Sequence, residues 1–191
     1  PFELLSRIAS ECFMPFSYGG GIRGIEDIRK ILEMGAEKIS LNDYALENPS
    51  FIREAADQFG SQSIIVAIDV KKNNQGQYEV FSQNGKKGWE KDPLQWAIGV
   101  EKLGAGEILL NSIDNDGTME GYDLELIEKV SRAVGIPVIA SGGAGSLEDF
   151  GRAKKVGASA LAAGSLFVFL GPYRAVLINY PNQEELEKIL S

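Results

Sequence analysis

The sequence predicts a (β/α)8 TIM barrel, an α/β fold in which eight parallel strands alternate with helices, here built from two similar halves. Three observations lead to this prediction. Six short apolar runs alternate with helical patterns along the 191 residues, a glycine-rich unit occurs twice, and the spacing of its copies requires two more strands before residue 1. We therefore expect residues 1–191 to form a single barrel domain that is incomplete at its N-terminus.

Six apolar runs rich in valine, isoleucine, leucine and alanine are the expected strands. None alternates strictly between apolar and polar residues, which is typical of parallel strands buried on both faces. In chain order they are residues 15–18, 38–41, 64–68, 107–110, 137–140 and 160–163.

Helices are expected where apolar residues recur every three or four positions. The clearest patterns lie at 25–34, 49–59, 93–103, 124–134 and 147–156, and another begins at residue 2. Ser146 with Asp149, and Asn48 with Pro49, are typical of helix N-termini. The polar stretch 71–89 predicts a small hairpin after the third strand.

A repeat relates two parts of the chain at an offset of 122 residues, so that residue 15 aligns with residue 137. Residues 14–22 read MPFSYGGGI and residues 136–144 read IPVIASGGA, and the similarity continues without a gap through a helix and a second strand. The strands at 64–68 and 107–110 then need counterparts before residue 1, which gives eight strands. The alternative, an open parallel sheet of six strands, leaves the register of the repeat unexplained.

The composition excludes several classes of function. With 19 Lys+Arg against 27 Asp+Glu and a net charge of −8, the chain is not expected to bind nucleic acid or an anionic membrane. No apolar run is long enough for a membrane span. The single cysteine, Cys12, allows no internal disulfide and fits a cytoplasmic protein. Histidine is absent, which excludes a Ser-His-Asp triad and the commoner zinc sites, so acid–base chemistry falls to other side chains.

The working residues of such barrels lie just after the C-terminal ends of the strands. Asp69 ends an apolar run there and is the best candidate for a general acid or base, the alternative being a structural cap. Two glycine turns at equivalent repeat positions present backbone N–H groups near helix N-termini, which suits phosphate. They contain Gly20 and Gly21 in one copy and Gly142 and Gly143 in the other. We expect two phosphate sites on opposite sides of one mouth, and a substrate with two phosphates.

For the other charged residues the sequence gives weaker evidence of a function. Asp114 and Asp116 lie among turn residues that lack the remaining ligands of a calcium loop, so we expect no metal there, and no cofactor. Lys38 and Glu107 begin their strands at the opposite end of the barrel. There they form either a solvated rim or a ring of opposite charges around the axial entrance.

Eight motifs between residues 2 and 169 resemble the cyclase subunit of imidazole glycerol phosphate synthase. They are YGGGI (18–22), GAEKISLN (35–42), NPS (48–50), FGSQS (59–63), VAID (66–69), GAGEILL (104–110), SIDNDGT (112–118) and IASGGAG (139–145). This family is a (β/α)8 barrel with half-barrel symmetry, in agreement with the repeat.

The resemblance implies a lyase of histidine biosynthesis. A glutaminase partner at the N-terminal barrel face supplies ammonia along the barrel axis. The ammonia reacts with a bisphosphorylated ribulosyl aminoimidazole intermediate to give imidazole glycerol phosphate and an aminoimidazole ribotide. Asp69 matches one of two catalytic aspartates, and the other belongs to a strand expected before residue 1. The implied substrate and phosphate residues are Gly20, Gly21, Asn42, Asp116, Gly117, Gly142, Gly143, Gly164 and Ser165. The implied gate and partner-face residues are Glu37, Lys38 and Glu107.

Three departures from the family keep two alternatives open. Asp43 and Asn111 stand where the family typically has threonine, and the tail at 171–181 differs from the usual one. The tail resembles a paralogous branch associated with sugar amidination in surface-polysaccharide biosynthesis, where the barrel would pass ammonia to a sugar amidotransferase. The other alternative is a non-catalytic ammonia conduit. We place the cyclase first because most mouth residues are intact, and we expect Asp43 to turn away from phosphate or to pair with a cation.

Overall fold

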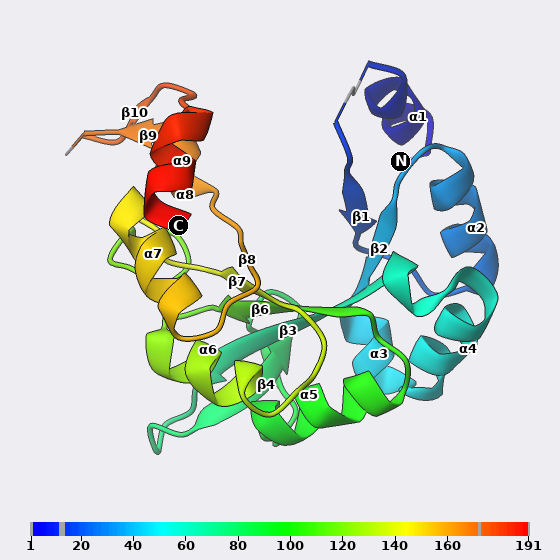
Figure 1. Cartoon of the computed structure of the whole chain (residues 1–191). Coiled ribbons are helices and arrows are strands. Elements are labelled where there is room, and N and C mark those ends of the chain that lie inside the picture. The colour runs from blue at the N-terminus through cyan, green and yellow to red at the C-terminus, as the bar shows by residue number, and fades with distance from the viewer. Residues whose placement is uncertain (1, 12–13, 172, 191) are drawn as a thin grey trace.

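One curved parallel sheet forms the centre of the molecule. The computed structural model describes residues 2–11, 14–171 and 173–190. Six strands follow one another in the sheet in chain order, and each neighbouring pair is parallel. Figure 1 shows this sheet curling into an arc, a half-barrel with helices around it. The strands are β1 (Ser17–Gly19), β2 (Lys38–Leu41), β3 (Ile64–Lys72), β6 (Glu107–Ser112), β7 (Val138–Ser141) and β8 (Ala160–Leu161).

The strand prediction is confirmed, because each predicted apolar run overlaps one of these strands. Pairing between chain-order neighbours is what strand–helix–strand crossovers produce. Within the described residues, β1 pairs only with β2 and β8 only with β7, so the arc is open between these two edges. The curled sheet with its surrounding helices agrees with the predicted (β/α)8 fold. The two further strands stay a prediction.

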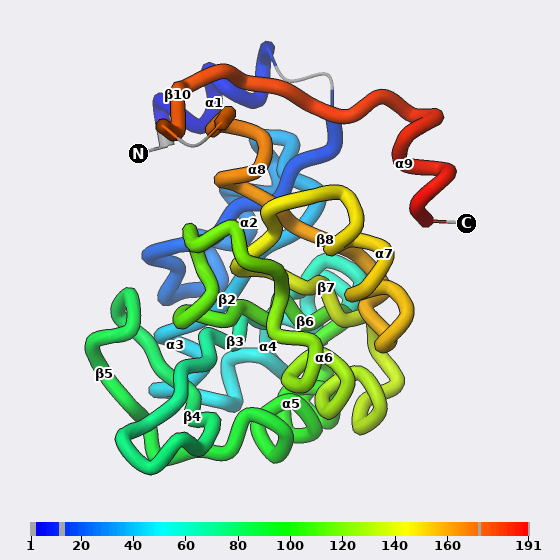
Figure 2. Tube along the Cα trace, turned by 90° about the vertical axis from the view of Figure 1, so that its left-hand side faces the viewer, coloured from blue at the N-terminus to red at the C-terminus, as the bar shows by residue number. Residues whose placement is uncertain are grey.

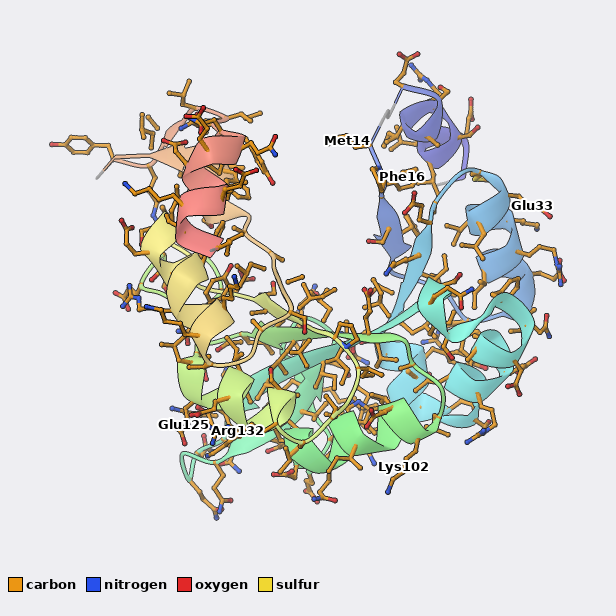
Figure 3. The ribbon with its side chains drawn as sticks, in the orientation of Figure 1. Met14, Phe16, Glu33, Lys102, Glu125 and Arg132 are labelled. Atoms are coloured by element: carbon orange, nitrogen blue, oxygen red, sulfur yellow. The ribbon has the colours of Figure 1, made fainter. Side chains whose placement is uncertain are left out.

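Helices surround the arc, as their apolar spacing predicts. Five lie between successive strands of the arc: α2 (Ile25–Glu33), α4 (Ser50–Phe59), α5 (Pro93–Lys102), α6 (Leu124–Ser131) and α7 (Leu147–Lys155). The others are α1 (Phe2–Glu11), α3 (Asp43–Glu47), the 3-10 turn η1 (Ser61–Ser63), α8 (Ser165–Val168) and α9 (Gln183–Leu190). Figure 2 shows α1 and α9 at the end of the molecule away from α5. Charged side chains such as Glu33, Lys102 and Glu125 point outward from the helices (Figure 3).

The two faces of the sheet differ in burial, because successive side chains of a strand alternate between them. On β3, Ile64, Val66 and Ile68 are fully buried in the core that the sheet shares with the helices. Ala67 and Asp69, on the inner face, are only partly buried. The sequence predicted strands buried on both faces. On the inner face that prediction holds for Ile65, which is buried, but is wrong for Ala67 and Asp69, since the arc of the described chain does not close around them.

The repeat is confirmed in the backbone. Helices α2 and α7 start and end at positions that differ by the repeat offset. The paired glycines adopt the same left-handed backbone: φ is +106° at Gly20 and +88° at Gly142, and +72° at Gly21 and +107° at Gly143. Few residues other than glycine adopt these angles, because a Cβ would clash with the backbone. The two halves therefore build the same turn at the same end of the sheet.

Both predicted helix starts are found, but only one has a side-chain cap. The Asp149 carboxylate accepts the backbone N–H of Ser146 at 2.8 Å, which completes the predicted capping box of α7. At α4, which begins directly after Pro49, the Asn48 side chain makes no capping bond; its Oδ1 accepts the Ser50 hydroxyl at 2.7 Å. The Asn48 carbonyl accepts the Phe51 N–H at 3.0 Å, so Asn48 contacts the first turn through its backbone.

The predicted hairpin at 71–89 is part of the main sheet. Strand β3 continues to Lys72, and β4 (Tyr78–Ser82) pairs antiparallel with this extension, followed by β5 (Lys87–Gly88). The first strand of the hairpin is thus β3 itself, because its hydrogen-bonding edge is free beyond the end of β2. As a result, the turn between β4 and β5 lies near the C-terminal ends of the parallel strands.

The ends of the described chain carry exposed apolar side chains. On α1, Leu5 is buried while Leu4 and Ile8 are 62% and 50% exposed. After α8, β9 (Phe169–Leu170) and β10 (Ala175–Val176) form a small antiparallel pair, and α9 then packs on α7. Cys12 lies outside the described residues. Among the described helices, none is long and apolar enough to cross a membrane.

Candidate active site at the C-terminal ends of the strands

Asp69 lies on the inner face of β3 between two asparagine side chains. Asn42, the first residue after β2, donates its Nδ2 to Oδ2 of Asp69 at 2.8 Å. Asn111 on β6, directly opposite Asp69 in the strand register, donates its Nδ2 to Oδ1 at 3.1 Å. Each carboxylate oxygen thus accepts one amide donor and keeps further acceptor capacity. The two amides hold the carboxylate in one orientation, so a proton can be moved at a defined place.

A cavity of about 330 Å³ opens beside Asp69. It is enclosed by the first glycine turn, the end of β2 and the turn between β4 and β5. The residues that line it are Gly19, Gly20, Gly21, Ile22, Arg23, Ser40, Leu41, Asn42, Asp43, Tyr44, Ala67, Asp69, Gln83 and Asn84. The structure therefore brings together four of the predicted site residues, Asp69 with Gly20, Gly21 and Asn42. We call this the first cavity.

Asp43 lines the first cavity and holds one of its walls. Its Oδ1 accepts the backbone N–H of Gln83 at 3.3 Å. Gln83 and Asn84 have left-handed backbones, with φ of 55° and 56°, and they turn the chain between β4 and β5. The carboxylate is therefore engaged by a backbone donor. The structure shows a main-chain N–H as its partner, and the expectation that Asp43 turns away from a bound phosphate stays a prediction.

A second, smaller cavity lies at the equivalent place in the other half. It measures about 30 Å³ and is lined by Asp116, Gly117, Ser141, Gly142, Gly143, Ala144, Ala162, Ala163, Gly164 and Ser165. The structure thus brings all six predicted residues of this half together. A Cβ at Gly142 would lie 2.5 Å from the Ser112 carbonyl oxygen, so the close approach of these loops also requires glycine. We call this the second cavity.

The loop that carries Asp116 is fixed by hydrogen bonds to its own side chains. Asn115 accepts the Ser112 hydroxyl at 3.1 Å and donates to the Gly121 carbonyl at 2.8 Å. Asp114 accepts the backbone N–H of Lys72 at 2.9 Å and so has a structural role. Nearby, Tyr122 donates its hydroxyl to the Ala162 carbonyl at 3.0 Å, and burial raises the pKa of this hydroxyl well above its ordinary value.

Lys38 and Glu107 form an ion pair at the opposite end of the inner face. Glu107 lies opposite Ile65, two inner-face residues below Asp69, and Lys38 begins β2 just below the pair of Ile39 with Ile64. Their side chains are about a third and a fifth exposed, so the pair is partly shielded from solvent. Glu37 is exposed beside them. The arrangement agrees with opposite charges facing the axis rather than with side chains free in solvent.

Residues 1–171 match the profile of the family described as "Histidine biosynthesis protein". The chain belongs to this family. The matched residues include all six strands of the arc, both copies of the repeat and Asp69.

Named relatives fall within the same family. A provisionally named imidazole glycerol phosphate synthase subunit hisF2 of Pseudomonas aeruginosa is 49% identical over 187 residues, covering 97% of this chain and 74% of its own length. A provisionally named subunit hisF3 of Vibrio vulnificus is 47% identical over 194 residues, covering 99% and 74%. Imidazole glycerol phosphate synthase subunit HisF of Dictyoglomus thermophilum is 50% identical over 167 residues, covering 87% and 66%. The family resemblance found in the motifs is therefore confirmed.

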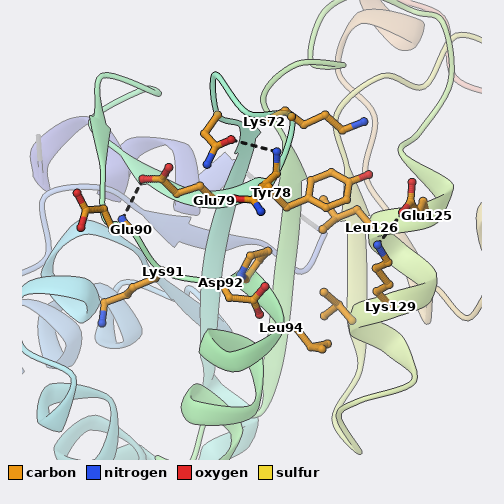
Figure 4. A pocket seen from close by; sticks show the side chains of 15 residues that line it. Lys72, Tyr78, Glu79, Glu90, Lys91, Asp92, Leu94, Glu125, Leu126 and Lys129 are labelled. Atoms are coloured by element: carbon orange, nitrogen blue, oxygen red, sulfur yellow. Dashed lines mark hydrogen bonds and ion pairs between the residues drawn. The ribbon is translucent and has the colours of Figure 1, made fainter.

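A larger cavity, of about 790 Å³, lies on the outer side of the protein, between β4 and helices α5 and α6 (Figure 4). Several of its charged groups are already paired or used in the fold. Glu125 and Lys129 form an ion pair at 2.6 Å, and Asp92 caps α5 by accepting the Gln95 N–H at 2.9 Å. Tyr78 donates to Asp123, the residue that caps α6; burial and this hydrogen bond raise the Tyr78 pKa. We therefore place the site in the two mouth cavities.

Sequence reasoning missed several residues of the mouth. Asn111 was noted only as a departure from threonine, yet it holds Asp69. The strand register could have indicated this contact, because residues 69 and 111 end runs that pair side by side. Arg23, Gln83 and Asn84 also line the first cavity. Among the described residues, no group of three or more acidic, cysteine or histidine side chains is placed to hold a metal.

Proposed function

We propose that this chain is the cyclase subunit of an imidazole glycerol phosphate synthase, a lyase that acts in the cytoplasm. It would use ammonia to convert a bisphosphorylated ribulosyl aminoimidazole intermediate into imidazole glycerol phosphate and an aminoimidazole ribotide. The observation that carries the proposal is the placement of Asp69. A carboxylate oriented by two amides lies beside one glycine-turn cavity, and the repeat provides a second such cavity at the same end of the sheet.

The residues of the mouth have distinct proposed roles. Asp69 moves a proton on the substrate as general acid or base, because its carboxylate faces the first cavity and retains free acceptor positions. Backbone N–H groups of Gly20 and Gly21, with Asn42, bind one phosphate. The other phosphate is proposed to lie in the second cavity, whose predicted binding residues are Asp116, Gly117, Gly142, Gly143, Gly164 and Ser165. A ligand with a phosphate at each end would span the mouth past Asp69.

Ammonia is proposed to enter at the other end of the inner face. There Lys38 and Glu107 form their ion pair, and Glu37 lies exposed on the rim where a glutaminase subunit would dock. We also propose that residues 1–191 belong to one barrel domain. Two further strands would pair with the free edges of β1 and β8 and contribute the second catalytic aspartate that the resemblance implies.

The function is tested by turnover with ammonium salts. We expect the protein, in its complete form, to convert the bisphosphorylated intermediate to imidazole glycerol phosphate when ammonium is supplied, and to do so with glutamine only when a glutaminase subunit is added. Product is measured by mass spectrometry. Absence of turnover with ammonium, together with intact binding of the glutaminase, would reject the cyclase and leave a non-catalytic conduit.

A second candidate is the sugar-amidination paralogue, in which the barrel passes ammonia to a sugar amidotransferase. One observation favours it: Asp43 lines the first cavity, where its negative charge would repel a phosphate. The tail gives no such support, because the relatives that align over 97–99% of this chain are themselves named as imidazole glycerol phosphate synthase subunits.

The variant Asp43→Thr separates the two candidates. For a cyclase we expect the wild-type protein to bind a bisphosphorylated imidazole ribotide, and the threonine to change Kd by less than about threefold, because the Gln83 N–H already engages the Asp43 carboxylate. Calorimetry measures both values, with Asp57→Thr on the exposed face of α4 as control. Absent wild-type binding that the threonine restores would favour the paralogue.

A further inference from the structure

The tail of the chain reaches back to the second cavity through one arginine. Arg174 lies in the turn between β9 and β10, and its Nη2 donates to the Gly117 carbonyl at 2.9 Å and to the Thr118 carbonyl at 3.4 Å. Gly117 is a lining residue of the second cavity. The guanidinium has five N–H donors, of which these contacts use those of Nη2, so other donors remain for a ligand. The tail is therefore bonded to a loop that forms one wall of a predicted phosphate site.

The backbone of this turn is held in an unfavourable conformation. Arg174 has φ of 48°, a left-handed angle that costs a residue with a Cβ about 1–2 kcal/mol. The turn is closed by a hydrogen bond from the Arg174 N–H to the Gly171 carbonyl at 3.0 Å. Burial does not hold it there, because the preceding residue, Tyr173, is 95% exposed. A strained backbone without a packing reason indicates that the position of its side chain matters.

The internal repeat shows a difference in charge between the two cavities. In the first half, Arg23 lines its cavity and carries a positive charge, although it also forms an ion pair with Glu47 at 3.1 Å. Its repeat partner is Gly145, and a Cβ there would lie 1.9 Å from the Met119 carbonyl oxygen, so no side chain fits. The lining of the second cavity contains the carboxylate of Asp116 and no lysine or arginine. The second half thus has no cation at the repeat position. Arg174 is not itself a lining residue, but its guanidinium is bonded to the backbone of Gly117, which is one.

We propose that Arg174 is the cation of the second anion site, where it binds the phosphoryl group of a phosphate monoester and holds the Gly117–Thr118 backbone in place. Guanidinium donors match phosphate oxygens in geometry and charge. This inference rests on the proposed function, because it assumes a substrate with a phosphate in each half.

The test is a titration with inorganic phosphate followed by NMR at single glycine amides. Gly117 and Gly143 report on the second cavity, and Gly20 and Gly21 report on the first within the same sample. In Arg174→Gln we expect Kd at the second cavity to rise about three- to tenfold, while Kd at the first cavity does not change. The dependence of the second Kd on salt should weaken at the same time, because one charge is lost. Arg174→Lys should restore part of the affinity, since it keeps the charge without the planar fork.

Arg132→Gln, at the exposed end of α6, is the matched control and should leave both Kd values unchanged. An unchanged second Kd in Arg174→Gln, or an equal rise in both cavities, would overturn the inference while leaving the proposed function intact. A lowered affinity whose salt dependence stays that of the wild-type protein would show a purely structural role and would also overturn it. Phosphate binding in neither cavity of the wild-type protein would instead reject both this inference and the bisphosphorylated substrate of the proposed function.

Discussion

Replacing Asp69 with asparagine is expected to reduce cyclisation by about 10²–10⁴-fold, the usual contribution of a general acid or base. The side chain keeps its size and its place on the inner face of β3, but it can no longer take up and release a proton. Folding should survive. One of the two hydrogen bonds that Asn42 and Asn111 donate would then face the new amide NH2 group instead of a carboxylate oxygen. Two donors in contact cost about 1 kcal/mol, and the cost is relieved if one of the amides flips.

The measurement is initial-rate turnover with ammonium, alongside the unfolding midpoint and the Kd for the bisphosphorylated ligand. Asp57→Asn, on the exposed face of α4, is the control for removing one carboxylate and should leave all three quantities at wild-type values. If Asp69→Asn turned over at nearly the wild-type rate, Asp69 would be a structural cap. A loss of turnover that accompanied a loss of ligand binding would also contradict a purely chemical role.

Much of the mouth was predictable because the repeat and the strand order constrain it. Parallel strands that alternate with helices place their carboxyl ends at one edge of the sheet. The apolar runs therefore predict the place of Asp69, and the glycine pairs predict the places of both cavities. The positive φ angles of Gly20 and Gly142 explain why glycine stands in both copies of the repeat. Local sequence was sufficient here because each feature follows directly from the end of a strand.

The remaining features depend on contacts between distant residues. Asn111 reaches Asp69 only because β3 and β6 pair in one register, and Asp43 reaches Gln83 only because the hairpin bends over the mouth. Arg174 reaches the Gly117 carbonyl across more than fifty residues. No periodicity encodes such contacts. The prediction that strands are buried on both faces was wrong for part of the inner face for a related reason, since burial there depends on how far the arc closes.

The two halves of the repeat should respond very differently to the same substitution. Gly143→Ala is expected to lower the free energy of unfolding by about 2–5 kcal/mol, the sum of a left-handed backbone and an overpacked contact. A Cβ at Gly143 would lie 2.2 Å from the Gly121 carbonyl oxygen, which itself accepts Asn115 Nδ2. Gly121 also donates its N–H to the Gly143 carbonyl at 2.8 Å, so neither loop can move without breaking the other's hydrogen bond.

Gly21→Ala is the matched control, because it occupies the equivalent repeat position and also has a positive φ, of +72°. A Cβ at Gly21 would meet no atom within 4 Å, so we expect only the backbone penalty, about 1–2 kcal/mol. Urea unfolding at an unchanged m-value measures the difference between the two variants. Equal destabilisation would mean that the backbone angle alone requires these glycines. A larger loss at Gly143 would show that the second half needs glycine for a further reason, because its loops close around a cavity of about 30 Å³ whereas those of the first half border one of about 330 Å³.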